Sequence, residues 1–554
     1  MTGGFGRGRR RTFVVAGTVV AAVTAVVGFA IAVPSVSQNR PYPTASPVRS
    51  DLAPSSEPWA RLLQLSTDLG ESNSRSITVL VTLRSSMRPI VLGSWANAHH
   101  LGMTWDHGAR FALLDGTARN VARAFGVSID NFRSRTGESF YAATSQAVMP
   151  VALRTEVSGI GSITNYGRPV EELMSPDFVP TPGLDPSELL QAYEASGLAS
   201  SGLQGQGETV VFMESGPVET ADLQAYDNKF GLPAPNLVIS GGDGSGGASE
   251  SGEADMDIET VHAEAPQAKL VYFNLATTPG ASNSTDAAGL LAQAITDAST
   301  DFPGAIISAS LGICELGSNS SDIQAISNAA QQAESSGSTI FASSGDTGGA
   351  DCGSFGADSL TSAKGVVFPA VAPNVTGVGG TTLSTTSTGS YVGETTWSSP
   401  MMSQGSGGGV STIVSRPSWQ TGPGVGSGGV PDMREVPDVG ADADPVTGIA
   451  MISNGQLQSS GGTSLSAPIW AGLTVLLDQY LKQNGQSPIG FANPLFYKLA
   501  ADTNLSPSPF HQVTVGGNVF YQAGPGYNPI TGVGTPDTAA LAVYILAFEK
   551  TGTP

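Results

Sequence analysis

Short apolar strands alternate with helical segments beyond Gly205, and this alternation constrains the fold more than any other feature of the chain. Four segments have the character of buried strands: residues 209–213, 269–275, 305–310 and 339–343. Helical periodicity is clearest over residues 287–299 and 321–335. Such alternation predicts an α/β fold with a doubly wound, mostly parallel sheet covered by helices on both faces. Active groups then gather at the carboxyl ends of the strands.

The region before residue 205 has a different pattern of predicted strands and helices. A strand pattern at residues 77–83, an amphipathic helix at 117–125 and a strand-like segment at 140–151 indicate a small α+β unit, which closes near residues 157–170. Four prolines within residues 174–186 then predict an exposed connector. Proteases would cut there.

The N-terminus has the features of an export segment. Arginines at positions 7 and 9–11 precede an uncharged apolar run over residues 13–33, which predicts a signal peptide over residues 1–33. Because a run of about 20 residues can also span a bilayer, an uncleaved membrane anchor remains an alternative. Residues 34–57, rich in Pro and Ser, form a linker. Both alternatives predict an extracytoplasmic protein, secreted or anchored on the outer side of the membrane.

The composition excludes one large class of partner. The chain has 25 Lys and Arg residues against 46 Asp and Glu residues, a net charge of −21, so nucleic acid is not expected to bind. Charged residues make up only 13% of the chain, and 70 residues are Gly. A low charge density limits self-repulsion in acid, which is compatible with an acid-stable exported protein.

Ser464 lies in a Gly-Gly-Thr-Ser segment that is suited to presenting a nucleophile. Three of the five histidines lie before residue 108, and neither His262 nor His511 lies in a His-Gly-Thr segment. A nucleophilic Ser464 therefore needs another base, and carboxylates are the plentiful candidates. The alternative is an N-capping residue before an apolar helix at residues 469–481, with Pro468 at its start.

Carboxylates occur in two positions suited to this chemistry. Glu253 and Asp257 are four residues apart on a predicted helix, so they lie on one side of it and can share a proton. An apolar stripe beside them places the pair at the border of a buried face, which raises at least one pKa. Asp346 follows the strand at 339–343 on a tight turn. The carboxylate pair has a simpler explanation as acids at a helix N-terminus, and Asp346 has one as a turn-forming Asp.

These segments together resemble the sedolisins, or serine-carboxyl peptidases, which are acid-acting endopeptidases with a subtilisin-like fold. Four blocks match in the family's order: residues 252–259, 344–346, 434–444 and 461–464. Residues 107–170 are similar to the family's prosegment, and residues 204–216 to the opening of its mature enzyme. The resemblance implies an activation prodomain at 58–180 and a subtilisin-like peptidase domain at 181–554.

The resemblance also implies the roles of five residues. Ser464 is the nucleophile, Glu253 its general base, and Asp257 the carboxylate that orients Glu253 and shares a proton with it. Asp346 donates a hydrogen bond to the oxyanion, and Glu214 extends the proton-sharing network behind Glu253. A carboxylate base needs a raised pKa and a carboxyl donor needs its proton, so both roles imply an acidic working pH.

The C-terminal region resembles the family's calcium site, with two differences. The corresponding residues are Gln512, Val513, Gly524, Gly526 and Asn528. Gln512 and Asn528 stand where aspartates are expected, so the site lacks both carboxylate charges. Because affinity falls with ligand charge, weak calcium binding or none is expected.

Three further features surround the expected active site. Cys314 and Cys352 each follow a strand end on the same rim, and in an exported protein they are expected to form one disulfide. Leu311 stands where family members commonly have tryptophan, so the resemblance does not define the details of the proton-sharing network or of the substrate wall. The glycine-rich run at 405–409 either lets a peptide approach as an added strand or forms a flexible loop.

The sequence thus predicts an exported, acid-active serine endopeptidase made as a zymogen. Its partners would be protein or peptide substrates and its own prodomain, with membrane anchoring through residues 13–33 as an option. The prodomain would block the cleft at neutral pH, and acid would release it by self-cleavage within residues 174–185. Two alternatives remain: a binding module of this fold that has lost activity, and an esterase. The esterase would need a Gly-x-Ser-x-Gly elbow and a histidine.

Overall fold

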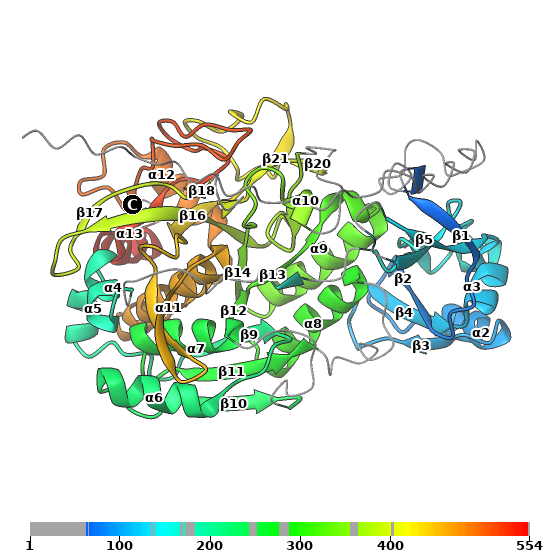
Figure 1. Ribbon diagram of the computed structural model, residues 1–554, viewed down its shortest axis with the longest axis horizontal. Helices are drawn as coiled ribbons and strands as arrows, with labels where there is room; N and C mark the ends of the chain where they lie inside the picture. The colour runs from blue at the N-terminus through cyan, green and yellow to red at the C-terminus, as the bar shows by residue number, and fades with distance from the viewer. Residues whose placement is uncertain are drawn as a thin grey trace, which may run out of the picture. The chain divides into compact units, whose positions relative to one another are not determined.

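A mostly parallel β-sheet is the central element of the structure, which is a computed structural model (Figure 1). The structure describes residues 63–64, 66–134, 137, 139–166, 170–171, 183–242, 252–275, 287–354, 364–399 and 404–551. The strands of the main sheet are β9 (Thr209–Glu214), β10 (Asn236–Ser240), β11 (Lys269–Asn274), β12 (Ile306–Ala309), β14 (Thr339–Ser343), β16 (Thr376–Thr385), β17 (Tyr391–Thr396) and β22 (Val439–Asp442). Their order is β10-β11-β9-β12-β14-β16-β17, with β22 also paired to β16.

The pairing directions confirm the predicted doubly wound sheet. Every ladder from β10 to β16 is parallel, as is the β16–β22 ladder, whereas β17 is antiparallel to β16. Because parallel neighbours need a crossover, helices separate most of these strands along the chain. The carboxyl ends of β9, β12 and β14 consequently lie at the same edge of the sheet.

Helices cover both faces of this sheet (Figure 1). One face packs against α7 (Glu253–Glu264), α11 (Thr463–Gln483), α12 (Asn493–Ala501) and α13 (Thr538–Thr551), and the other against α8 (Ala287–Asp301) and α9 (Ser320–Ser335). Strand β9 shows the alternation directly. Its Val210 and Phe212 belong to the first core, and its Val211 and Met213 belong to the second.

The N-terminal region forms the predicted α+β unit. Its elements are β1 (Thr67–Glu71), β2 (Ile77–Leu83), α2 (Ile90–Ala98), β3 (Gly102–Thr104), β4 (Phe111–Gly116), α3 (Ala118–Phe125), β5 (Ile129–Arg133), β6 (Ser139–Ala143), η1 (Val151–Leu153) and β7 (Val157–Ile160). They make two sheets, β3-β4-β2-β7 and β1-β5-β6. Helix α3 begins as expected, because the Thr117 side chain accepts from the Asn120 N–H, and Gly126 ends it in the left-handed conformation.

One strand prediction in this region is wrong. The strand-like segment at 140–151 is a strand only in β6, and η1 begins at Val151. Val148 and Val151 are exposed, so their apolar side chains do not mark a buried strand. Pro150 has no N–H to donate to a ladder, which favours an irregular segment here.

The N-terminal unit contacts the peptidase region through apolar side chains that join the core beside α8 and α9 and through main-chain groups. Asp322 on α9 accepts from the Ser162 N–H at 3.0 Å through Oδ1 and at 3.2 Å through Oδ2. Asn319 Nδ2 donates to the carbonyl oxygen of Ile160 at 3.1 Å. In addition, β8 (Val170–Glu171) pairs antiparallel with β13 (Leu311–Cys314), which follows β12 almost directly.

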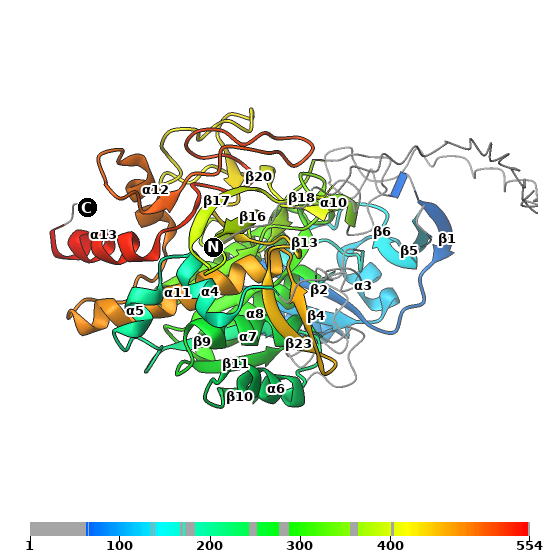
Figure 2. The ribbon, with the colours of Figure 1, turned by 60° about the vertical axis from the view of Figure 1, so that its left-hand side comes forward.

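Shorter elements complete the peptidase region. They are α4 (Pro186–Ala192), α5 (Ser196–Ser200), α6 (Thr220–Phe230), η3 (Glu315–Gly317), α10 (Asp351–Ser354), β15 (Val367–Phe368), β18 (Ser398–Ser399), β19 (Gln404–Gly405), β20 (Gly409–Ser415), β21 (Met433–Val436), β23 (Ile449–Ser453), β24 (Gln456–Ser460), β25 (Phe510–His511) and β26 (Thr535–Pro536). The β23–β24 hairpin lies beside α7 (Figure 2), where the Ile452 N–H donates to Glu259.

Several sequence predictions fall on residues outside the described ranges. These are the signal or anchor at 1–33, the linker at 34–57 and most of the connector at 174–186. Within the described ranges, no helix has the length and apolar character needed to cross a membrane.

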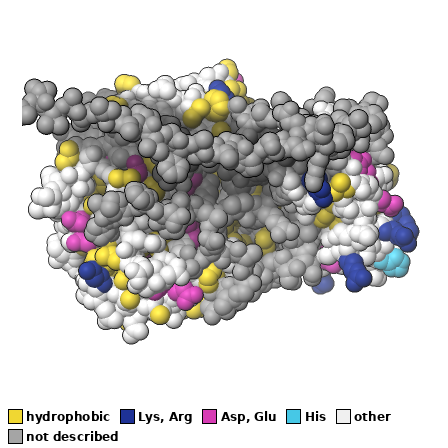
Figure 3. Space-filling model, viewed as in Figure 1, with side chains coloured by type: hydrophobic (Ala, Val, Ile, Leu, Met, Phe, Trp, Pro, Cys, Tyr) yellow, Lys and Arg dark blue, Asp and Glu magenta, His cyan; other side chains and the backbone are white. Residues whose placement is uncertain are grey.

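Acidic side chains of described residues lie scattered among uncharged polar ones on the face drawn in Figure 3.

Candidate active site

Ser464 is the second residue of α11 and is fully buried. The helix begins at Thr463 rather than near residue 469, so the predicted boundary is wrong. Pro468 lies inside the helix, in its second turn. Proline is tolerated so early in a helix when the carbonyl that loses its donor finds another partner. The Ser464 Oγ has no hydrogen-bond partner among the residues that the structure describes.

The two histidines outside the N-terminal unit are engaged elsewhere. His262 Nε2 lies 2.8 Å from the Pro233 carbonyl oxygen and 3.1 Å from Asp227 Oδ1. His511 Nε2 lies 3.1 Å from Glu194 Oε2. This agrees with the sequence argument that a base for Ser464 has to be a carboxylate.

Helix α7 carries Glu253 as its first residue and Asp257 one turn later. All twelve residues of α7 are buried, so the prediction of a carboxylate pair at the border of an amphipathic helix is wrong. The helix is enclosed because α11 covers one side and the β23–β24 hairpin another. Burial raises the pKa of two other carboxyls of this helix, to about 7 for Asp255 and to about 10 for Glu259.

Ser310 connects α7 to α11. It follows β12 directly, and its Oγ lies 2.6 Å from Asp257 Oδ2 and 3.1 Å from the main-chain oxygen of Ser464. These contacts bring together two blocks that are more than 200 residues apart in the chain. Ser310 has no role among the sequence-based predictions. The available signal was Pro468, because a proline four residues after Ser464 leaves that carbonyl without its helical donor.

Asp346 contacts Thr463, the residue that precedes Ser464. Its Oδ1 accepts from the Thr463 N–H at 2.7 Å and from the Thr463 hydroxyl at 2.9 Å. The Thr463 hydroxyl also accepts from the Gly345 N–H at 3.1 Å. Gly462 has φ of 100°, and a Cβ there would lie 2.7 Å from Asp346 Oδ2. Glycine at this position therefore permits both the backbone conformation and the close approach of the carboxyl group.

The glycine-rich run at 405–409 packs against the turn that carries Asp346. All five residues are buried, so the run is not a flexible loop, whereas the approach of a peptide as an added strand stays a prediction. The Gly407 N–H donates to the Gly345 carbonyl at 2.6 Å. A Cβ on Gly407 would lie 2.2 Å from Asp351 Oδ2, so glycine is required by close packing rather than by flexibility. Complete burial raises the pKa of the Asp351 carboxyl well above its usual range.

A disulfide joins Cys314 and Cys352, with an S–S distance of 2.06 Å. This confirms the predicted pairing. Cys314 ends β13 and Cys352 lies in α10, six residues after Asp346. The bond therefore ties the strand that pairs with β8 to the segment that follows the Asp346 turn.

Glu214 and Leu311 lie close to these elements. Glu214 is the last residue of β9, is fully buried, and stands opposite Asn274 in the parallel ladder. Leu311 begins β13 and is buried in the core on the α8 and α9 side of the sheet. The position of Glu214 at a strand end is the one expected for a residue behind an active site.

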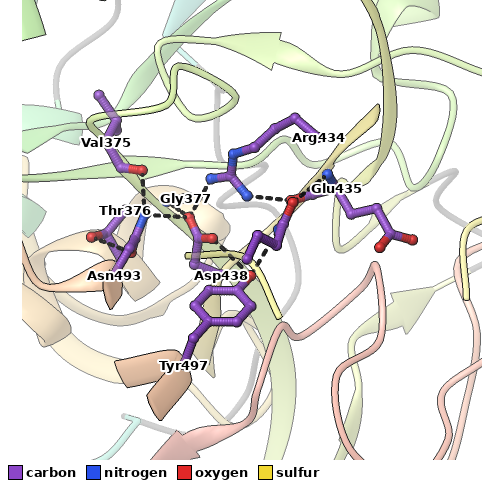
Figure 4. Close-up of polar contacts among 9 residues, drawn as sticks. Val375, Thr376, Gly377, Arg434, Glu435, Asp438, Asn493 and Tyr497 are labelled. Carbon is purple, nitrogen blue, oxygen red and sulfur yellow. Dashed lines mark hydrogen bonds and ion pairs between the residues drawn. The ribbon is translucent and has the colours of Figure 1, made fainter. Parts of the chain in front are cut away.

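The block at 434–444 forms a buried ionic cluster around Asp438 (Figure 4). Arg434 Nη2 donates to Asp438 Oδ2 at 2.5 Å, and neither side chain is exposed. Tyr497 donates to Asp438 Oδ1 at 2.9 Å, and the Gly377 N–H donates to Oδ2 at the same distance. Asn493 Nδ2 donates to Oδ2 at 3.2 Å. The contacts fasten β22, β16 and α12 to one another, so this block supports the site structurally.

The segment that resembles a calcium site has hydrogen-bond donors where a cation would need oxygen ligands. Asn528 Nδ2 donates to the Val513 carbonyl at 3.2 Å and to Thr531 Oγ1 at 3.0 Å. Asn528 Oδ1 accepts from the main-chain N–H groups of Ile530 and Thr531, at 3.2 and 3.1 Å. These donors fix the amide orientation, because the reversed amide would place N–H against N–H.

Gln512 takes part in a similar contact, since its Oε1 accepts from the Gly526 N–H at 3.3 Å. The Val513 carbonyl oxygen, one of the expected calcium ligands, is thus already satisfied by an amide N–H. Calcium prefers oxygen ligands with carboxylates among them. The residues present do not fit a calcium site.

Comparisons with known proteins agree with this geometry. Residues 223–489 match the family model Peptidase_S8, the subtilase family. Kumamolisin from Bacillus sp. (strain MN-32) is 33% identical over 499 residues, which cover 83% of this chain and 83% of the relative. Sedolisin from Pseudomonas sp. (strain 101) is 33% identical over 455 residues, covering 78% and 74% respectively.

A solved structure gives the same result for the fold. It is Pseudomonas sedolisin, a serine-carboxyl proteinase, complexed with two molecules of pseudo-iodotyrostatin. It aligns with a TM-score of 0.55 at 33% identity, over 66% of this chain and 98% of that one. The fold is therefore subtilisin-like, and the chain belongs to the sedolisin family of serine-carboxyl peptidases.

Proposed function

We propose that the chain is an exported, acid-acting serine endopeptidase, made as a zymogen, that cleaves protein or peptide substrates. Ser464 is the nucleophile, Glu253 the general base, Asp257 its carboxylate partner and Asp346 the oxyanion donor. The observation that carries the proposal is the pair of contacts around the nucleophile. Asp346 is bound to Thr463, the residue before Ser464, and Asp257 reaches the Ser464 main chain through Ser310.

In the acylation step, Ser464 Oγ attacks the carbonyl carbon of the scissile bond and its proton passes to Glu253. Asp257 shares a proton with Glu253 and so stabilises the base as its protonation changes. The carboxyl group of Asp346 donates its proton in a hydrogen bond to the developing oxyanion. Collapse of the intermediate expels the amine, which takes the proton from Glu253, and water then hydrolyses the acyl-enzyme by the same sequence.

The Asp346 contacts suit the donor role. Because Oδ1 accepts two hydrogen bonds from Thr463, the acidic proton is expected on Oδ2. A carboxyl group donates only while it is protonated, so this assignment requires an acidic working pH. Glu214, fully buried at the end of β9, is the proposed extension of the proton-sharing network.

Strand β8 supports the zymogen part of the proposal. It lies before the predicted cleavage segment and pairs antiparallel with β13, directly after Ser310. An extended peptide that adds a strand to an exposed edge is a common mode of substrate binding. We infer that the prodomain occupies a substrate strand position, and that acid releases it by self-cleavage within residues 174–185.

Calcium is not required at the loop of residues 512–528 in this proposal. The amide contacts of Asn528 and Gln512 replace the interactions that a cation would make.

Export through residues 1–33 follows the sequence argument and leaves secretion and outer-surface anchoring as alternatives. A secreted protein would separate from the membranes of the producing cells, whereas an anchored one would remain with them. Cell fractionation would distinguish these two alternatives.

The test is hydrolysis of a denatured protein from acid to neutral pH by wild type, Ser464→Ala and Glu253→Gln, after acid pre-incubation. Activity confined to acid and abolished by either substitution is the expected result. Glu259→Gln is the matched control, because Glu259 is a buried glutamate on the same helix whose Oε2 accepts from the Ile452 N–H. This variant is expected to retain activity.

The other outcomes are equally informative. No peptide hydrolysis at any pH, despite removal of the prodomain, would favour an inactive binding module. Hydrolysis of esters without hydrolysis of peptides would favour an esterase. Processing of pure Ser464→Ala protein in acid would contradict self-cleavage.

A further inference from the structure

The first turn of α11 has a gap in its hydrogen-bond ladder next to the nucleophile. In an α-helix the N–H of residue i donates to the carbonyl of residue i−4, so position 468 would serve the Ser464 carbonyl. Pro468 has no N–H. A buried carbonyl without a donor costs free energy, so Ser464 is a poor place for this gap unless another donor is present.

Ser310 lies where that donor is needed. Its Oγ is 3.1 Å from the Ser464 carbonyl oxygen and 2.6 Å from Asp257 Oδ2, and Ser310, Ser464 and Asp257 are all fully buried. We propose that Ser310 is a positioning residue, which replaces the donor that Pro468 lacks and fixes the main chain of Ser464 relative to the carboxylate helix α7. This inference rests on the proposed function of Ser464.

The single proton of the Ser310 hydroxyl constrains the contact further. One hydroxyl cannot donate fully to both Asp257 and the Ser464 carbonyl. The Ser310 proton is therefore assigned to the Ser464 carbonyl, and the Asp257 contact varies with the location of the proton that Asp257 shares with Glu253.

The location of Ser310 suits a positioning role. It lies between β12, a central strand of the main sheet, and β13, which the Cys314–Cys352 disulfide holds. Side chains on such rigid elements position a site more accurately than side chains on loops. The connection therefore runs from a rigid strand to the first turn of α11.

Loss of the Ser310 hydroxyl is expected to reduce kcat while KM changes little. Ser310→Ala removes the donor and lets the Ser464 turn shift, and displacements of about 1 Å in an active site cost on the order of 100-fold in rate. We expect kcat to fall roughly 10- to 100-fold. Ser310→Thr keeps a hydroxyl and is expected to recover part of this loss, which a role in packing alone would not predict.

A double-mutant cycle with Pro468→Ala tests the cause directly. Alanine at 468 restores the main-chain N–H, so the Ser464 carbonyl regains its helical donor. Ser310→Ala is then expected to cost less in the Pro468→Ala background than in the wild type, for kcat and for the melting temperature. Melting temperatures and near-UV circular dichroism would verify that all variants are folded.

The outcomes separate this inference from the proposed function. An inactive wild type would overturn the proposed function itself. An active wild type in which Ser310→Ala has the same kcat, or in which the two substitutions are additive, would overturn only the positioning role. If Ser310→Ala fails to fold, the Ser310→Thr and Pro468→Ala variants still test it, because a positioning role predicts a lower kcat for Thr that Pro468→Ala partly restores.

Discussion

Thr463 binds Oδ1 of Asp346 twice, through its main-chain N–H at 2.7 Å and its hydroxyl at 2.9 Å. The two residues are 117 positions apart, yet one side chain fixes both the start of α11 and the orientation of the carboxyl group. The proposed oxyanion donor is thus held by the residue adjacent to the proposed nucleophile. Any change at one of these residues acts on the other.

Two substitutions of Asp346 distinguish its proposed role as oxyanion donor from its role as hydrogen-bond acceptor for Thr463. Asp346→Ala removes both, and kcat is expected to fall by about 100- to 1,000-fold, the usual effect of deleting an oxyanion donor. Asp346→Asn keeps an acceptor for Thr463 and places an amide N–H where the carboxyl proton would be. It is expected to retain more activity than the alanine variant, which steady-state kinetics on a peptide substrate would measure. Equal activity of the wild type and both variants would remove Asp346 from the mechanism.

Asp438 provides a test of the buried ionic cluster. Asp438→Ala leaves the fully buried Arg434 guanidinium without its carboxylate, and breaking a buried pair in this way costs about 3–5 kcal/mol. A large fall in the free energy of unfolding is expected from denaturant titration. Asp438→Asn keeps the side-chain volume, so comparison of the two variants separates lost charge from lost packing. A stability equal to wild type for the alanine variant would contradict the structural role.

Buried carboxyls predict that the folded protein is most stable in acid. Burial raises the pKa of Asp255 and Asp478 to about 7 and that of Glu259 to about 10. Because these pKa values lie above those of the unfolded chain, the stabilisation is fully present below about pH 4 and is lost as pH rises, up to about 7 for the two aspartates and about 10 for Glu259. Each titrating group contributes a slope of about 1.4 kcal/mol per pH unit over this interval. Melting temperatures are therefore expected to fall from acid to neutral pH.

A variant of α11 identifies one source of this dependence. Asp478 accepts from the Ile489 N–H at 2.8 Å, and asparagine can accept the same bond without becoming charged. Asp478→Asn is expected to flatten the dependence of melting temperature on pH. Asp432→Asn is the matched control, because Asp432 is exposed. An unchanged slope in Asp478→Asn would show that this carboxyl is not among the groups responsible.

The loop at residues 512–528 predicts indifference to calcium. The melting temperature of the wild type is expected to be the same in EDTA and in calcium chloride at about pH 6, where an ordinary aspartate is ionised. Gln512→Asp combined with Asn528→Asp turns one carboxylate toward the Val513 carbonyl, so this variant is expected to lose stability in EDTA and to regain it with calcium. Gln324→Asp combined with Asn504→Asp adds the same charge at exposed positions and controls for it. A higher melting temperature of the wild type in calcium than in EDTA would contradict the inference that the Gln512 and Asn528 amides take the place of a bound calcium ion.

The central sheet was accessible from the sequence because its strands are short, apolar and separated by helical periods. The strand at Thr339–Ser343 was predicted with the observed boundaries, and Asp346 was correctly expected on the turn that follows it. The Cys314–Cys352 pairing was also predictable, since both cysteines follow strand ends on one rim. These features depend on local pattern and on the common direction of parallel strands.

Features that depend on tertiary enclosure were not accessible in the same way. The carboxylates of α7 suggest an exposed face by composition, but neighbouring elements bury the helix entirely. The glycine-rich run at 405–409 has the composition of a loop, although close packing against Asp351 is what requires it. The role inferred for Ser310 needed the position of Pro468 in the helix, and the predicted helix began too late to show it.

The pairing of β8 with β13 has a consequence for the proposed activation. Strand β8 belongs to the same chain as its partner, so its local concentration is set by the connecting chain and does not change when the protein is diluted. A single cut between them would turn an intramolecular contact into a bimolecular one. Release would then depend on the concentration of the protein, and a dilute environment would itself favour the separation of β8 from β13.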